Sequence, residues 1–176
     1  MFFEDIVDQN GVILSLVNSI IRGRIAPIYL FQGPCGTGKT STAWVFTAAL
    51  NCLATGDVKP CGVCTECAGY ISGKSRVITE IDGSNKNGIY KVRFLLKKLQ
   101  MGSTSTFIRH NVYVIDECHL LLSKLCLAFQ KFLEEPSSGI VFIFINTDLD
   151  NVPRSVLSRC QKYLFNKLKM VTSLIS

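Results

Sequence analysis

The stretch Gly33-Pro34-Cys35-Gly36-Thr37-Gly38-Lys39-Thr40 decides how the rest of the chain is arranged. It matches the phosphate-binding loop pattern of a glycine, four residues and then Gly-Lys-Thr at every required position. The apolar segment 28–31 precedes it, and residues 41–50 have the composition of a helix, so the context is strand, loop, helix. The alternative is an ordinary glycine-rich turn, but such a turn does not require Lys-Thr at its end.

The chemistry of this loop predicts which groups contact a nucleotide. Glycines let backbone N–H groups approach phosphate oxygens where a Cβ would obstruct them, and the following helix N-terminus adds a favourable partial charge. We expect Lys39 to reach the β- and γ-phosphates and the Thr40 hydroxyl to bind Mg²⁺, which prefers oxygen ligands. The predicted contact set is Gly33, Pro34, Cys35, Gly36, Thr37, Gly38, Lys39, Thr40 and Ser41.

Length and composition indicate one globular domain. The chain has 176 residues, of which 48% are hydrophobic and 18% charged, enough for one substantial core. No apolar run approaches the ~18 residues that span a bilayer, and residues 1–5 lack the basic start of a secretory signal. We therefore expect an intracellular protein without a membrane partner, with an organelle-targeting segment upstream left open. The net charge of +6 suits contact with phosphates but is also common on solvated surfaces.

Four of the eight cysteines form a metal-like cluster. Cys52, Cys61, Cys64 and Cys67 are separated by eight, two and two residues, which can wrap one tetrahedral ion. Zinc favours thiolates, and four sulfur ligands leave no open position, so a structural zinc site is expected. Unligated thiols or a redox pair are the alternatives, although a redox motif does not need four cysteines. A phosphate loop requires intracellular nucleotide, so reduced thiols are favoured over a disulfide scaffold.

A second chemical signature is the apolar strand 111–115 followed by Asp116 and Glu117. Carboxylates at the carboxyl end of a strand near a phosphate loop lie where the metal and the attacking water must be. We expect Asp116 to hold Mg²⁺, directly or through water, and Glu117 to orient the hydrolytic water. Two acids at a strand end are common, but they are the expected partner of a phosphate loop about 75 residues upstream.

Other segments complete the predicted layout. Residues 4–24 have the apolar spacing of one packing helix, 76–82 of a second strand and 119–135 of an apolar helix, in which His119 is expected to pack or cap. The continuously apolar segment 140–145 is typical of a central parallel strand, and the polar residues 146–148 at its end are positioned to meet a phosphate or water. From spacing alone Arg159 is a surface cation, since the loop already has a lysine.

The helix expected after residue 88 is basic. Its lysines and arginine, with one lysine in the preceding loop, are able to follow a nucleic-acid backbone, although an ordinary solvated helix has the same composition. The residues are Lys86, Lys91, Arg93, Lys97 and Lys98.

Taken together, these segments resemble the ATPase domain of the clamp loaders, which are AAA+ proteins, and in particular the bacterial DNA polymerase III gamma/tau subunit. The resemblance covers nearly the whole chain and includes the phosphate loop, the four cysteines, Val-Ile-Asp-Glu at 114–117, Phe-Leu-Glu-Glu-Pro at 132–136 and Leu-Ser-Arg-Cys at 157–160. The sequences at 71–76, 118–121 and 160–167 look most similar to the plant STICHEL-like branch.

The resemblance implies roles for three further residues. Thr147 would be the sensor of the γ-phosphate, with Asn146 the adjacent candidate, and Arg159 would enter the ATP site of the next subunit in an oligomer. It also implies that primed DNA and a sliding clamp are partners and that the basic helix contacts DNA. A plant STICHEL-like protein would be nuclear or cytoplasmic. Two departures are Cys35, at a position where relatives often have arginine, and the absence of the lid arginine, because the helical lid would begin at 167–176.

The expected fold is α/β: a parallel five-stranded sheet of the P-loop AAA+ type flanked by helices, in a core of residues 1–166 with a small zinc-binding insertion at about 52–70. The expected function is ATP binding and hydrolysis in a clamp-loader-like assembly, with weak activity for this segment alone. The alternatives are a STICHEL-like regulatory or scaffold protein that keeps the nucleotide fold, and a DNA-repair ATPase.

Overall fold

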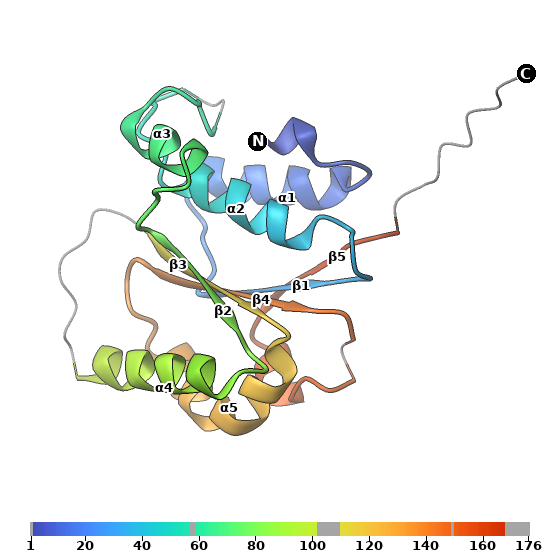
Figure 1. The fold of residues 1–176 in the computed structure, drawn as a ribbon, viewed down its shortest axis with the longest axis vertical. Helices are drawn as coiled ribbons and strands as arrows, with labels where there is room; N and C mark the ends of the chain where they lie inside the picture. Colours follow the sequence, from blue (N-terminus) through green and yellow to red (C-terminus); the bar gives the residue numbers. More distant parts are fainter. Residues whose placement is uncertain (1, 57–58, 102–109, 149, 168–176) are drawn as a thin grey trace, which may run out of the picture.

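A five-stranded parallel sheet forms the centre of the computed structural model, which describes residues 2–56, 59–101, 110–148 and 150–167. The strand order is β2-β3-β4-β1-β5, and every pairing is parallel (Figure 1). This confirms the predicted sheet. The strands are β1 (Ile28–Gln32), β2 (Ile78–Asp82), β3 (Asn111–Asp116), β4 (Ile140–Asn146) and β5 (Gln161–Leu164).

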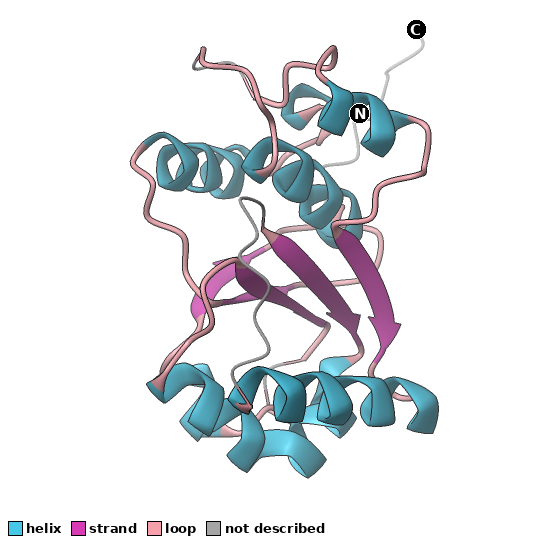
Figure 2. Cartoon of the chain, turned by 90° about the vertical axis from the view of Figure 1, so that its left-hand side faces the viewer, coloured by secondary structure: helices cyan, strands magenta, loops and turns pink. Residues whose placement is uncertain are grey.

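Helices cover both faces of the sheet, as Figure 2 shows. One layer contains the 3₁₀ helix η1 (Phe3–Asp5), α1 (Asn10–Ile21), α2 (Lys39–Leu50) and the short α3 (Thr65–Ile71). The other contains α4 (Lys86–Gln100), α5 (Cys118–Glu134) and α6 (Arg154–Leu157). Of the predicted lid segment 167–176, all but Lys167 lies outside the described residues.

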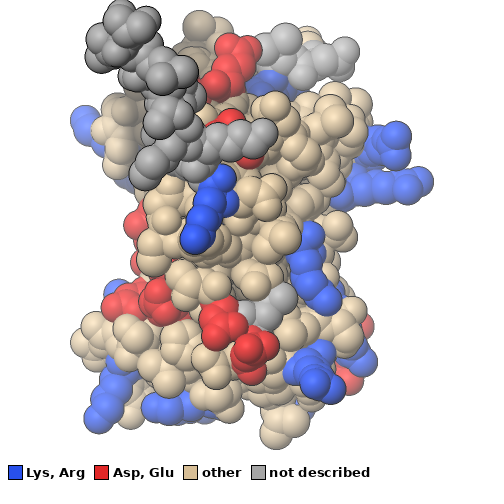
Figure 3. Space-filling view, turned by 90° about the vertical axis from the view of Figure 1, so that its right-hand side faces the viewer, with Lys and Arg blue, Asp and Glu red and all other residues tan. Residues whose placement is uncertain are grey.

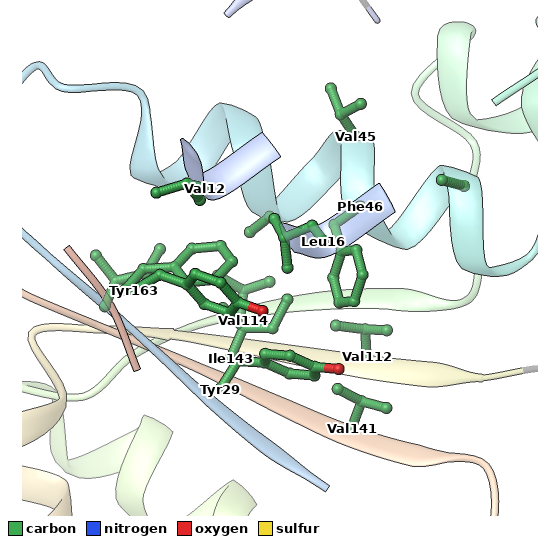
Figure 4. Close-up of a cluster of buried hydrophobic side chains, with 14 of the residues drawn as sticks. Val12, Leu16, Tyr29, Val45, Phe46, Val112, Val114, Val141, Ile143 and Tyr163 are labelled. Atoms are coloured by element: carbon green, nitrogen blue, oxygen red, sulfur yellow. The ribbon is translucent and has the colours of Figure 1, made fainter. Parts of the chain in front are cut away.

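Alternating side chains of the central strands fill two separate cores. In β1, Tyr29 and Phe31 pack toward α1 and α2, whereas Ile28 and Leu30 pack toward α5. Figure 4 shows the first core, where Tyr29 meets Phe46 of α2 edge to face at 5.1 Å between ring centroids. In the second core, Phe142 of β4 contacts Phe129 and other aromatic rings. Burial on both faces explains why β1 and β4 are continuously apolar.

The predicted helix over residues 4–24 is wrong at its start, over residues 4–9. Residues 3–5 form η1, and α1 begins only at Asn10. Between them Asp8 has φ 58°, a left-handed conformation that is incompatible with a continuous right-handed helix. The apolar face of α1 is as expected, with Val12 and Leu16 buried.

Within the described ranges, no helix combines the length and apolarity needed to cross a bilayer.

Candidate functional site

The carboxyl ends of the parallel strands place the phosphate loop and the acid pair on one edge of the sheet. β1 ends at Gln32, directly before the loop, and Gln32 is in register with Asn146 at the end of β4. β3, which ends at Asp116, lies on the other side of β4. The loop and the acids are thus two strands apart at the edge where open α/β sheets bind ligands.

The phosphate loop has the backbone geometry that its glycines predict. Gly36 and Gly38 adopt left-handed φ values of 74° and 86°, and α2 starts at Lys39. The Lys39 Nζ lies inside the loop, where it donates to the carbonyl oxygens of Gly33 and Pro34, each at 2.6 Å. Cys35 and Thr40 are exposed, so both side chains are accessible from solvent.

The charge of Lys39 is sensitive to its surroundings. Burial lowers the pKa of Lys39, and the nearby Cys35, Asp116 and Glu117 oppose this effect. Only 7% of the lysine is exposed, which removes most of its hydration. A bound anion would therefore stabilise its charged form.

The acid pair is shaped by an unusual backbone conformation. Glu117 has φ 49° and ψ 50°, a left-handed conformation that costs energy for a residue with a Cβ, and its N–H donates to the Asp116 Oδ1 at 2.9 Å. Both carboxylates are accessible, Glu117 at 46% of its side chain. His119 Nδ1 lies 3.7 Å from the Glu117 Oε2 and, among the described residues, has no hydrogen-bond partner.

An open pocket of about 500 Å³ joins Thr40 to these acids. The end of β2 also contributes, because Asp82 is in register with Asp116. This contribution was not predicted, although Asp82, like Asp116, is a polar residue at the carboxyl end of a predicted strand. Hydrogen bonds from the Ser84 hydroxyl and N–H lower the pKa of Asp82. The polar lining residues are Thr40, Glu80, Asp82, Ser84, Asp116 and Glu117.

The three residues assigned by resemblance lie in different surroundings. Asn146 is 2% exposed, and its backbone carbonyl accepts from the Gly33 N–H at 3.2 Å, so it touches the start of the phosphate loop. Thr147 is exposed, and its N–H donates to the Asn146 Oδ1 at 2.9 Å. Arg159 is exposed between α6 and β5, outside the core of its own subunit.

The four cysteines of the predicted metal site come together after α2. The sulfur atoms of Cys52, Cys61, Cys64 and Cys67 all lie within 4.8 Å of one another. In a tetrahedral zinc site with Zn–S distances of ~2.3 Å the sulfurs are ~3.8 Å apart, and Cys61 and Cys67 are separated by 3.9 Å. All four are free thiols. The geometry is therefore compatible with one four-coordinate ion.

Backbone N–H groups already favour thiolates at this cluster. Burial opposes ionisation of Cys64, but N–H donors from Cys67 and Leu53, with its neighbouring thiols, lower the pKa of Cys64 to about 6. Cys61 accepts from the N–H of Cys64 at 3.4 Å. Burial raises the pKa of Cys67 to about 12, so the last proton would leave only when a cation compensates the accumulated charge.

The exposed face of α4 carries large apolar side chains as well as the predicted basic ones. At 100° per residue, Tyr90, Phe94 and Met101 follow one line along the helix, and these three side chains are 63%, 71% and 84% exposed. Basic residues flank this line on both sides, and the Arg93 guanidinium lies over the Tyr90 ring at 5.9 Å. The two basic rows are Lys86, Arg93 and Lys97 on one side, and Lys91 and Lys98 on the other. The prediction that Lys86 lies in the preceding loop is wrong, because α4 begins at this residue. By contrast, the face next to β5 carries dispersed basic side chains, with acidic ones both near its top and in its lower half (Figure 3).

Comparison with known proteins relates this geometry to a family. The family described as DNA polymerase III, delta subunit matches residues 8–169. The chain belongs to this family. Among curated members of related sequence, Protein STICHEL of Arabidopsis thaliana is 59% identical over 169 residues, 96% of this chain and 14% of that protein. DNA polymerase III subunit tau of Bacillus subtilis is 35% identical over 166 residues, 94% of this chain and 29% of that protein.

These relatives confirm the predicted resemblance to the clamp loaders and to the STICHEL-like branch. The chain spans only 14% and 29% of the length of these two proteins. Solved structures support the fold alone. A DNA polymerase III gamma subunit-related protein of Thermotoga maritima superposes with a TM-score of 0.52 at 15% identity, over 92% of this chain and 47% of that one. RuvB of the same organism gives 0.58 at 16% identity, over 94% and 47%.

Proposed function

We propose that the chain binds and hydrolyses ATP as one subunit of an oligomeric, clamp-loader-like AAA+ assembly. The observation that carries the proposal is the common edge of the sheet, which holds a complete phosphate loop and the acid pair. An exposed Arg159, which precedes β5, is available to a neighbouring subunit. Relatives of this chain are AAA+ ATPase-type proteins. Residues 1–166 would act as one ATPase core, with the insertion at about 52–70 and the start of a lid at 167–176.

In this proposal each residue has a defined task. The N–H groups of the phosphate loop and the Lys39 ammonium hold the phosphates, while Thr40 and Asp116 hold magnesium, which would neutralise developing charge on the phosphates when bound. Glu117 orients the attacking water, and its accessible carboxylate at the rim of the pocket suits this task. Thr147 or the buried Asn146 responds to the terminal phosphate. Arg159 completes the site of the neighbouring subunit.

We also propose a structural zinc ion at Cys52, Cys61, Cys64 and Cys67. Four sulfur donors leave no position for a substrate, so the ion would supply order and no chemistry. Cys52 follows the end of α2 and Cys67 lies in α3, so the ion would fasten the insertion to the helix that starts at the phosphate loop.

A sliding clamp and primed DNA are the proposed partners, with the basic rows of α4 as the DNA-contacting surface. Aromatic side chains between rows of cations suit nucleic acid, because bases stack on rings while cations meet phosphates. Such a role requires an intracellular location, nuclear or cytoplasmic in the STICHEL-like case.

A regulatory or scaffold role is the second candidate, because the identity to Protein STICHEL exceeds that to the tau subunit. In that case the nucleotide fold is kept without clamp loading.

Steady-state ATP hydrolysis tests the proposal, measured on a chain that extends through the expected lid, with and without primed DNA and a sliding clamp. Under the ATPase proposal DNA and clamp stimulate turnover, and Lys39→Ala and Arg159→Ala each remove the stimulation. Lys162→Ala is a matched control, because this exposed lysine on β5 has no proposed role. If DNA and clamp do not stimulate hydrolysis by the unmodified protein, the scaffold role is favoured.

A further inference from the structure

One buried polar side chain outside the predicted site connects three distant segments. Gln9, the residue before α1, is 2% exposed, and its side chain makes no cap to the helix that it precedes. Polar groups are buried only where hydrogen bonds replace water. Its partners are therefore informative.

The Gln9 amide pairs with both backbone groups of a residue 157 positions away. Its Nε2 donates to the Asn166 carbonyl at 2.8 Å, and its Oε1 accepts from the Asn166 N–H at 3.1 Å. The Nε2 also donates, at 3.4 Å, to the carbonyl oxygen of Thr37 in the phosphate loop. The amide nitrogen and the amide oxygen of Gln9 are thus both used.

The segment that follows β5 also contacts the start of the phosphate loop directly. The Phe165 N–H donates to the Gln32 carbonyl at 2.7 Å, and a Cβ on Gly33 would come within 2.4 Å of the Phe165 carbonyl oxygen. Figure 1 shows the N-terminal segment, the turn before α2 and the end of β5 on the same side of the molecule. A change in the loop therefore has a short path to residues 165 and 166.

The bond to Thr37 has a consequence for phosphate binding. The Thr37 carbonyl and the Gly38 N–H belong to one planar trans peptide, so they point in opposite directions. A side chain that holds the carbonyl also fixes the direction of the N–H on the other side of that peptide. Gly38 has φ 86°, and glycine turns easily without such a restraint.

We propose that Gln9 is a positioning residue that orients the Thr37–Gly38 peptide for phosphate and transmits nucleotide binding to the chain beyond β5 through Asn166. This inference rests on the proposed ATP binding and names a contact through which the site signals. Gln9 is almost fully buried and bonds to the loop backbone at Thr37, so it acts through the loop.

Hydrogen exchange measured by mass spectrometry tests the coupling, with and without a non-hydrolysable ATP analogue and magnesium. In the unmodified chain the analogue slows exchange both in residues 33–40 and in 164–167, the latter by roughly tenfold, the scale of one or two hydrogen bonds. Gln9→Met keeps the length and removes all three bonds; Gln9→Glu keeps the acceptor for Asn166 and loses both donors. Both variants should keep protection of the loop at saturating analogue, reduce the change at 164–167 to under about twofold and weaken analogue binding roughly tenfold.

Asn51→Leu is the matched control. Asn51 is another buried amide that pairs with both backbone groups of a distant residue, donating to the His110 carbonyl at 3.0 Å and accepting from its N–H at 2.9 Å. It lies at the other end of α2. Its loss should lower stability without changing the response of residues 164–167.

The outcomes separate the two proposals. Native-like coupling in Gln9→Met and Gln9→Glu, or equal loss of coupling in Asn51→Leu, overturns the role of Gln9. If the analogue protects residues 33–40 of the unmodified chain but leaves 164–167 unchanged, the coupling fails while ATP binding stands. If the analogue protects neither segment, the proposed ATP binding fails and the coupling with it.

Discussion

Individual residues at the site are held mainly by backbone groups. Lys39 donates to two loop carbonyls, and Glu117 is directed by its own left-handed backbone and by the bond from its N–H to Asp116. Backbone bonds of this kind hold charged groups in position before a ligand binds, without help from a particular neighbouring side chain. The roles of these residues can therefore be separated by substitutions that keep shape and change only chemistry.

Glu117→Gln should separate binding from turnover. The amide keeps the size of the side chain but no longer polarises water, so we expect unchanged ATP affinity and a loss of roughly 10²–10⁴ in turnover. Equilibrium binding of a fluorescent ATP analogue and single-turnover hydrolysis measure the two effects. Glu134→Gln, an exposed residue at the end of α5, is the control, and turnover within a few-fold of the native rate in Glu117→Gln would assign the water to another group.

At the scale of helices and strands, close packing of α4 and α2 against β2 holds the pocket residues in position. A Cβ on Gly88, in the first turn of α4, would lie 2.4 Å from the Asp82 carbonyl oxygen, so glycine allows α4 to sit against the end of β2. Likewise, Trp44 of α2 donates a hydrogen bond to Glu80 of β2 and packs on Tyr70 of α3 at 5.5 Å between centroids. These contacts join the pocket to the cysteine insertion.

Gly88→Ala and Gly11→Ala should change stability in opposite directions. Both glycines lie in the first turn of a helix, but a Cβ at position 11 meets nothing within 4 Å. We expect alanine to destabilise by about 1–3 kcal/mol at position 88 through overpacking and to stabilise by up to about 1 kcal/mol at position 11 through helix propensity. Urea unfolding followed by circular dichroism compares them. Equal effects would mean that the approach of α4 to β2 is not constrained.

Removal of the proposed zinc should be visible at Trp44, the single tryptophan of the chain. One zinc per chain is expected by elemental analysis, and Cys64→Ser or a strong chelator should release it, loosen α3 and change the emission of Trp44 through loss of Tyr70. Cys126→Ser, at a cysteine of α5 outside the cluster, should keep the metal. A folded native chain without metal would contradict the assignment.

The sequence predicted the elements that carry strong local patterns. The predicted parallel sheet is confirmed. The phosphate loop and the cysteine cluster, which depend on spacing within a short segment, have geometries compatible with the predicted ligands, whose binding stays a prediction. The break at Asp8 was not predicted, because the polar residues 4–10 have the composition of a helix start and nothing in them marks a left-handed residue. Gln9 and the contribution of β2 to the pocket were also missed, since both depend on partners far away in the chain.

At the scale of the whole molecule, two residues with proposed roles are exposed: Thr147 just beyond the carboxyl end of β4, and Arg159 before the amino end of β5. An exposed cation that contributes nothing to its own core is suited to act on a second copy. The proposed assembly therefore predicts activity that depends on contact between subunits.

Mixing two inactive variants tests this dependence. Lys39→Ala loses its own phosphate site but keeps Arg159, whereas Arg159→Ala keeps the loop; the mixture should hydrolyse ATP although neither variant does so alone. The rate should rise steeply with protein concentration, because the active site forms between subunits. Mixed Lys39→Ala and Glu117→Gln chains are the control, since both defects lie in the same half of the site, and restored activity there would contradict the arrangement.

The strand order has a further consequence for folding during synthesis on the ribosome. β1 pairs with β4 and β5, yet 108 positions separate Gln32 from Ile140. A nascent chain that has already exposed the phosphate loop still lacks both neighbours of the strand that leads into it, and its apolar β1 is open to wrong pairing and to chaperones. Nucleotide can therefore stabilise this fold only after β5 has been synthesised, which makes binding a late checkpoint in the folding of this domain.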